Sequence, residues 1–373
     1  MVTSAWGTGD ELPRPERPPV APTRDAKDPL TYLALGDRMI GWGRADSAAA
    51  AFYWASRLDP TLAQPYYARS VALLLSYARR RKEQVGAAYW EPTAPIPIAR
   101  MATIDSLRRE ALSRNPFLPG SYDHLFTGRP PIFAIARMSD PGARGYWLYD
   151  LGQREMADSL LGVALRAKPG LALLREVRAR AEYDLGRYDS AAVNLRILLD
   201  TLSHRDSSTF RLGYRSKELI YYALGYTEAQ RGDTAAARIA FESAIAEDAA
   251  FYPAHARLAT LATSRGDPAT AAAELAIATE IAPNDPSLRF FYGDALLESG
   301  SPSRAIVEFL KAIDLDPWFA KPYLYLGKAH ESRGDLARAI EAYEEYASRE
   351  RVNEPARAWA TTHAEALRSR STP

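Results

Sequence analysis

Residues 286–319 read PSLRFFYGDALLESGSPSRAIVEFLKAIDLDPWF, and this stretch decides the fold. A Gly-Ser-Pro turn at 300–302 separates its two apolar segments, and Pro317 follows the second one. The same arrangement recurs in four contiguous units of 34 residues, which start at Glu218, Tyr252, Pro286 and Ala320. A period of this length indicates a repeated pair of helices.

Small residues recur at fixed positions of each unit, and large residues face them. We expect the small residues to let the two helices of one hairpin approach closely, with the large residues filling the surrounding space. Position 8 holds Gly225, Ala259, Gly293 and Gly327; position 20 holds Ala237, Ala271, Ala305 and Ala339; position 24 holds Phe241, Leu275, Phe309 and Tyr343.

The turn inside each hairpin has its own pattern of Gly followed by Asp or Ser. Glycine accepts the left-handed backbone that ends a helix, and the Asp or Ser oxygen caps the next helix. The turns are Gly232-Asp233, Gly266-Asp267, Gly300-Ser301 and Gly334-Asp335.

These motifs resemble the tetratricopeptide-repeat family, whose pattern has the form W-x2-L-G-x2-Y, then A-x3-F, then P. The resemblance implies an all-α fold, a right-handed α-solenoid of about eight helical hairpins. A further helix at 354–369 is predicted to cap the last apolar face, with Arg357, Glu365 and Arg368 on its polar outside. Its apolar stripe is predicted to hold Ala356, Trp359, Ala360, His363, Ala364 and Leu367.

The predicted domains follow from the regularity of this pattern along the chain. Residues 1–28 form a Pro-rich arm that we expect to be disordered. The predicted segments are N-terminal hairpins at 29–137 with irregular insertions at about 83–100 and 116–137, two hairpins at 138–205, a short insertion at 206–217, four contiguous hairpins at 218–353, and the capping helix and tail at 354–373.

Composition excludes several classes of function. Lys and Arg total 47 against 46 Asp and Glu, so the net charge of +1 argues against nucleic-acid binding. The chain has no cysteine, and its five histidines fit no metal-binding spacing, so we expect no metal or other cofactor.

No segment is apolar enough to span a membrane, which argues against membrane insertion. The Arg- and Ala-rich composition suggests a bacterial source. We expect a soluble protein of the cytoplasm, or of the periplasm if an N-terminal signal is missing from this chain.

In the resembled family, positions 2, 5, 9, 12 and 13 of each unit face the concave surface, where partner peptides bind. Aromatic residues there offer contact area, and charges set specificity; the alternative is that individual aromatics only pack between helices. The implied partner-binding residues are Glu176, Arg180, Tyr183, Tyr222, Tyr226, Gln230, Phe290, Asp294, Lys328 and Glu331. One subtype binds chaperone C-terminal tails through Lys and Asn, but Leu33 and Asp37 stand at those places, which disfavours such tails.

The insertions carry apolar side chains that are costly to leave in water. We expect them to fold back onto the solenoid or to form a second partner-binding patch. The candidate patch residues are Tyr89, Trp90, Phe117, Tyr122 and Phe126.

The sequence therefore predicts a protein-interaction scaffold or adaptor that binds a peptide segment or partner subunit on its concave face. A first alternative is a structural subunit that docks through its insertions and N-terminal arm while its own chain fills the groove. A second is an enzyme with a site in 89–137, where Asp123 and His124 adjoin, but no nucleophile motif accompanies them and we predict no catalytic residue.

Overall fold

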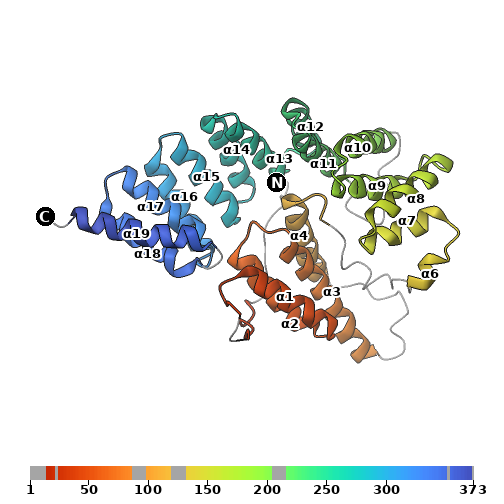
Figure 1. The fold of residues 1–373 in the computed structure, drawn as a ribbon, viewed down its shortest axis with the longest axis horizontal. Helices are drawn as coiled ribbons and strands as arrows, with labels where there is room; N and C mark the ends of the chain where they lie inside the picture. Colours follow the sequence, from red (N-terminus) through yellow and green to blue (C-terminus); the bar gives the residue numbers. More distant parts are fainter. Residues whose placement is uncertain are drawn as a thin grey trace. The chain divides into compact units, whose positions relative to one another are not determined.

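The structure, a computed structural model, describes residues 14–21, 24–85, 98–118, 132–203, 216–350 and 353–371. These residues form eighteen helices and no strand, which confirms the all-α repeat fold. The chain divides into two compact units (Figure 1). Unit 1 comprises Met1–Arg114 and Leu258–Pro373, and unit 2 comprises Asn115–Arg257.

Unit 2 is a run of helical hairpins in which each helix from α7 to α12 packs against the next. Helix α13 (Tyr252–Ser264) crosses the boundary between the units. The helices of unit 2 are α6 (Ile132–Ala136), α7 (Pro141–Asp150), α8 (Arg154–Ala167), α9 (Ala172–Asp184), α10 (Tyr188–Ser203), α11 (Lys217–Gln230) and α12 (Thr234–Glu247).

Unit 1 contains hairpins from both ends of the chain. The N-terminal helices are α1 (Pro29–Gly41), α2 (Ala45–Leu58), α3 (Gln64–Val85) and α4 (Ile98–Arg114). The C-terminal helices are α14 (Pro268–Ile281), α15 (Pro286–Glu298), α16 (Pro302–Leu315), α17 (Lys321–Ser332), α18 (Leu336–Arg349) and α19 (Glu354–Ser371).

Each hairpin is held at the crossing of its two helices by a small residue against a large side chain. A Cβ atom added to Gly36, Gly225, Gly293 or Gly327 would lie 2.4 to 2.6 Å from a ring atom of Phe52, Phe241, Phe309 or Tyr343, respectively. Real Cβ atoms do not approach so closely, so the ring occupies the space that a side chain would need. Where the unit has Ala259 instead of glycine, the residue at the ring position is the smaller Leu275.

The predicted turn chemistry is confirmed in part. Gly266 and its three counterparts in the other contiguous units have positive φ, as expected of a left-handed helix end. Asp233 and Asp267 accept hydrogen bonds from the amides of Ala236 and Thr270. Two predicted caps are wrong: Ser301 and Asp335 make no side-chain capping hydrogen bond, and the Asp335 carboxylate lies instead 3.5 Å from Nδ1 of His330.

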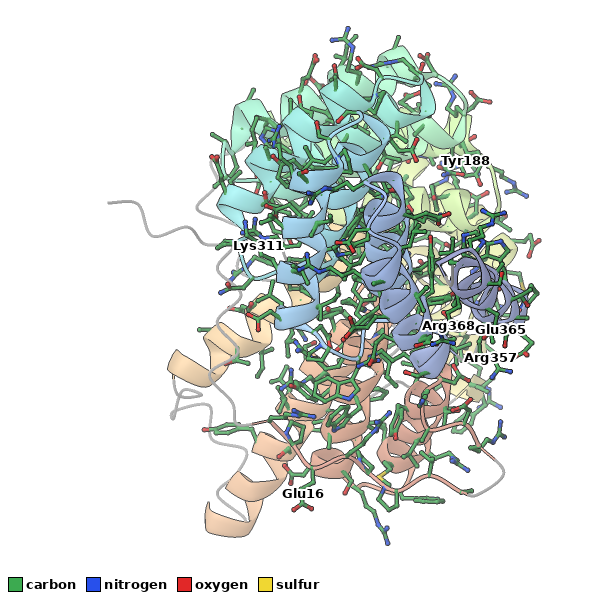
Figure 2. All side chains as sticks on the ribbon, turned by 90° about the vertical axis from the view of Figure 1, so that its left-hand side faces the viewer. Glu16, Tyr188, Lys311, Arg357, Glu365 and Arg368 are labelled. Carbon is green, nitrogen blue, oxygen red and sulfur yellow. The ribbon has the colours of Figure 1, made fainter. Side chains whose placement is uncertain are left out.

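Helix α19 covers the last hairpin as predicted for a capping helix. Ala360, Ala364 and Leu367 are buried in a cluster with Tyr343 and Tyr346 of α18, and Ala356 packs against it. Trp359 was predicted on the same stripe but is 45% exposed, and His363 is half-buried. Its outer face is polar, and Figure 2 labels Arg357, Glu365 and Arg368 there.

Part of the predicted disordered arm makes defined contacts in unit 1. The Arg14 guanidinium lies 4.6 Å from the ring centre of Trp54 and 3.9 Å from that of Trp318, and the two indoles meet edge to face at 5.0 Å. Arg17 donates to the Tyr32 hydroxyl at 2.9 Å. The residues from Arg14 onward therefore join the N-terminal hairpin to the loop after α16, because cation–π contacts offset the cost of ordering the arm.

Ion pairs also join the N-terminal helices of unit 1 to its C-terminal helices. Arg57 of α2 lies 3.1 Å from the Asp316 carboxylate, which is fully buried at the end of α16. Arg114 of α4 donates to Asp285 at 2.9 Å, and Asp285 also caps α15. Burial raises the pKa of Asp316 to about 7, although the attraction of Arg57 opposes this.

We expect Gly293→Ala to destabilise the protein by about 1–3 kcal/mol, because the added methyl group would overlap the Phe309 ring. The double variant Gly293→Ala/Phe309→Leu should lose less stability than the two single changes added together, since Ala259 and Leu275 already use that combination. Denaturant unfolding followed by circular dichroism measures both effects.

A matched control is Gly41→Ala, where an added Cβ meets no atom within 4 Å. This variant should be neutral or more stable by up to about 1 kcal/mol. Strict additivity of the two changes at 293 and 309 would contradict the proposed steric coupling.

Asp316 should make unit 1 less stable as the pH rises from about 4 to about 7. Its raised pKa means that the folded state holds a proton which the unfolded state has released in this range, so the proton's contribution to stability is lost as the pH passes the folded pKa. Asp316→Asn should flatten this part of the profile in unfolding measurements at several pH values.

The control is Asp314→Asn, an exposed position in α16 with the same change of charge. An equal flattening by Asp314→Asn, or an unchanged profile in Asp316→Asn, would exclude Asp316 as the group responsible.

Candidate partner-binding surfaces

The first helices of successive hairpins lie side by side. Besides its own partner helix, α7 contacts α9 and α15 contacts α17. We call the surface of α9 and α11 in unit 2 the aromatic wall, and the surface of α15 and α17 in unit 1 the acidic wall. The predicted concave-face residues belong to these two surfaces, each of which lies within one unit.

The aromatic wall is filled by residues of the chain itself. The ring of Phe117 stacks on that of Tyr183, with centres 3.9 Å apart and planes at 9°. Tyr226 adds a tilted contact with Phe117 at 6.4 Å. Phe117 is only 3% exposed, so this surface binds an aromatic side chain contributed by the segment after α4.

A charged group on the same wall holds the main chain of this segment. Arg180 donates to the carbonyl oxygen of Leu118 at 3.2 Å and forms an ion pair with Glu176 at 3.0 Å. The Asn115 side chain accepts from the amide of Phe117 at 2.9 Å, which closes a local turn. Side-chain stacking and a main-chain hydrogen bond thus act together on four residues, 115–118.

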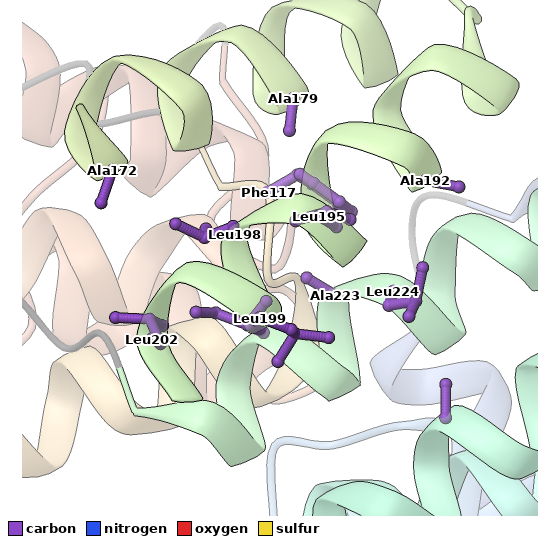
Figure 3. Close-up of a cluster of buried hydrophobic side chains, with 12 residues drawn as sticks. Phe117, Ala172, Ala179, Ala192, Leu195, Leu198, Leu199, Leu202, Ala223 and Leu224 are labelled. Carbon is purple, nitrogen blue, oxygen red and sulfur yellow. The ribbon is translucent and has the colours of Figure 1, made fainter. Parts of the chain in front are cut away.

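Phe117 reaches the hydrophobic cluster between α9, α10 and α11 (Figure 3). Ala179, Leu195 and Leu198 belong to this cluster, and Leu195 stands at the large position of its hairpin. The ring therefore extends a core that the helices build at their own crossing points.

The remaining predicted residues of the aromatic wall have separate surroundings. Tyr222 is fully buried between helices, with its ring 5.4 Å from that of Phe251, and its hydroxyl accepts from Arg257 at 2.9 Å. Gln230 is exposed at the end of α11. For Tyr222, the alternative of packing between helices is the one observed.

The acidic wall combines buried and accessible groups. Phe290 is buried against Phe319 and Tyr325, whereas Phe291 is 42% exposed. The Lys328 ammonium lies 4.3 Å from the ring centre of Tyr325. Phe290 thus belongs to the core, and the adjacent Phe291 faces solvent.

Asp294 is the electrostatically unusual group of this wall. Burial, together with repulsion from Glu298, raises the pKa of Asp294 to about 6, despite the attraction of Lys328. Asp294 is half-buried and Glu298 is exposed, and the attraction of Lys328 does not outweigh burial and repulsion at Asp294. The wall therefore carries negative charge that the protein compensates incompletely.

Glu331 is engaged by the capping helix. It accepts from the Tyr343 hydroxyl at 2.8 Å and lies 2.9 Å from Nε2 of His363, whose ring stacks on Trp359. These hydrogen bonds help to hold the pKa of Glu331 below its usual value, against the opposing effect of burial.

Of the predicted insertion patch, only Phe117 lies among the described residues. Tyr89, Trp90, Tyr122 and Phe126 lie outside them, as do Asp123 and His124. For Phe117, the expectation that an insertion folds back onto the repeats is met by its contact with α9 and α11.

Unit 1 also contains a cavity of about 120 Å³ beside the two ion pairs. Its lining includes Arg57, Arg69, Arg114, Asp285 and Asp316. The cavity is therefore polar, and it lies between the N-terminal and the C-terminal helices of unit 1.

The described residues include no cluster of three or more His, Cys, Asp or Glu side chains suited to a metal ion. Nor do they include a helix with the length and hydropathy needed to cross a membrane.

Sequence reasoning missed the residues that join the chain ends. Trp54 and Trp318 stand at positions that the repeat pattern leaves variable, so the period gives no reason to pair them. The only available signal was the presence of large aromatics outside the periodic core.

Comparison with known proteins places the repeats in one family. A family model described as tetratricopeptide repeat matches residues 256–317. A TPR repeat-containing protein of Pseudomonas aeruginosa, PA0015, is 36% identical over 58 residues, which is 16% of this chain and 55% of that protein. The chain thus spans about half the length of this curated relative.

Solved structures of repeat proteins are also similar. The C-terminal part of a TPR repeat-containing protein from Cytophaga hutchinsonii is 17% identical and covers 55% of this chain and 77% of its own, with a TM-score of 0.47. YrrB, described as a TPR protein with an unusual peptide-binding site, is 19% identical and covers 54% and 97%, with a TM-score of 0.43. MamA from Desulfovibrio magneticus is 20% identical and covers 49% and 97%, with a TM-score of 0.42.

The repeated 34-residue pattern, the helical hairpins that it forms and the family model that matches residues 256–317 identify the repeats of this chain as tetratricopeptide repeats.

Proposed function

We propose that this protein is a scaffold that binds a cationic segment of a partner protein on its acidic wall. The tetratricopeptide-repeat fold supports a protein-interaction scaffold in general. The observation that carries the specific proposal is the pair of carboxylates Asp294 and Glu298, whose charge Lys328 compensates only in part.

The physical reason is the cost of burying a carboxylate. Asp294 is partly removed from water and repelled by a second carboxylate one helical turn away, so its ionised form is destabilised. A Lys or Arg side chain of a partner would supply the missing attraction. The interaction would favour cationic sequences over neutral ones by electrostatic complementarity.

The neighbouring aromatic groups suit the remainder of such a segment. Phe291 exposes 42% of its surface, and Tyr325 already holds a cation, Lys328, over its ring. An Arg or Lys of the partner can use the same kind of contact. Apolar and charged recognition would then occur on adjacent turns of α15 and α17.

The alternative of a structural subunit is favoured by a different observation. The chain's own Phe117 fills the aromatic wall, as that alternative requires of the groove. The N-terminal arm, however, contacts Trp54, Tyr32 and Trp318 of its own chain from Arg14 onward, so this part of the arm is not free for docking elsewhere.

The test is a selection of random phage-displayed peptides on the immobilised full chain. We expect enrichment of Lys and Arg on the wild-type protein, and loss of that enrichment on Asp294→Lys. For a selected peptide, Asp294→Lys should weaken binding by about 10-fold or more, equivalent to about 1.4 kcal/mol. Affinity for the wild type should rise between about pH 5 and pH 7 as Asp294 loses its proton.

Glu242→Lys on the exposed side of α12 is the matched control, because it changes the net charge equally. An equal loss of peptide affinity in Glu242→Lys would show that the effect of Asp294→Lys comes from the net charge of the protein and not from the acidic wall. Selected peptides without cationic enrichment would contradict the proposal directly.

A further inference from the structure

The aromatic wall in unit 2 has features of a peptide-recognition site that is already occupied. Its occupant is a short turn, 115–118, that presents one aromatic side chain and one carbonyl group. Tyr183 stacks face to face on the Phe117 ring, and Arg180 donates to the Leu118 carbonyl oxygen. The wall therefore contacts both a side chain and the main chain of the segment.

The helices of the wall also hold one another in place. The helices α9 to α12 pack in sequence on one another, and Ala179, Ala192 and Leu195 are buried at their crossings. Tyr222 is fixed by Arg257 and by the ring of Phe251. Phe117 adds its ring to this cluster. The packing of α9 to α12 on one another and the contacts of Tyr222 do not pass through Phe117, so we expect the helices to keep their arrangement when the segment leaves.

The occupant's contacts with the wall are of a kind that another segment can form. They include the stacked ring, the tilted contact with Tyr226, the hydrogen bond from Arg180, and burial of the Phe117 ring in the cluster of α9 to α11. A segment from another protein that carries an aromatic residue can form the same set. Because Phe117 is part of the same chain, it would compete with the partner segment for the wall. The apparent affinity for the partner would equal the intrinsic affinity multiplied by the fraction of molecules in which the wall is free.

We propose that the aromatic wall is a binding site for a partner segment bearing a phenylalanine, and that the segment 115–118 is its built-in competitor. The partner binds by displacing Phe117 from Tyr183 and by taking the Arg180 hydrogen bond. The site consists of residues other than those of the acidic wall, so its test does not depend on the proposed function.

The probe is a fluorescent peptide with the sequence of residues 112–121, LSRNPFLPGS, added to the full chain. It should bind the Phe117→Ala variant at least about 10-fold more tightly than the wild type, because the internal competitor is gone. The same peptide with Ala in place of Phe should lose this binding. So should the double variant Phe117→Ala/Tyr183→Ala.

Two further variants complete the design. Phe117→Leu keeps an apolar side chain against Tyr183 and should give an intermediate affinity. Asp294→Lys should leave binding of the peptide unchanged, which separates this site from the acidic wall. Equal affinity of the probe for wild type and Phe117→Ala would overturn the proposal.

A measurement on the wild-type chain covers the case in which Phe117→Ala does not fold. Hydrogen exchange with excess probe should show loss of amide protection at 115–118 while α9 to α12 keep theirs. Retained protection at 115–118 at saturating probe, or joint loss in the four helices, would show that the segment is a fixed part of the core and would overturn the proposal.

Discussion

The contact on which the fold depends is a glycine or alanine of one helix lying against a large side chain of its partner. At Gly225, Gly293 and Gly327 the ring lies where a Cβ atom would be, so the distance between helix axes is set by the absence of a side chain. Gly145 shows the same relation to Leu161 in unit 2. Because interiors are close-packed, this contact constrains two positions per hairpin. The buried alanines at position 20 add a third, and the solvent-facing helical positions are left free to vary.

That division explains how far the sequence predicts the structure. Second helices start at Thr234, Pro268, Pro302 and Leu336, which are spaced by the 34-residue period, because the packing contact and the turn glycine both recur with it. The period cannot predict contacts outside the repeat. The Arg57–Asp316 pair joins residues from opposite ends of the chain, and Phe117 belongs to an irregular segment.

The candidate site was predictable to a similar degree. Family geometry pointed to the first helices, where Tyr183, Arg180 and Asp294 do lie. It could not separate residues that pack inward from those that face solvent, because one helical turn decides between them. Phe290 is buried while the adjacent Phe291 is not, and Tyr222 is covered by Phe251 and Arg257. Which side chains remain available depends on neighbours that the pattern does not encode.

The two walls use the same architecture with opposite chemistry, and this accounts for their different states. Tyr183 and Tyr226 offer apolar ring faces whose exposure to water costs free energy, so a nearby aromatic side chain of the same chain covers them. Glu298 is exposed to water, and burying a carboxylate under apolar side chains costs free energy. An aromatic surface therefore gains free energy when an aromatic side chain of the same chain covers it, whereas an acidic surface gains most from a group of opposite charge.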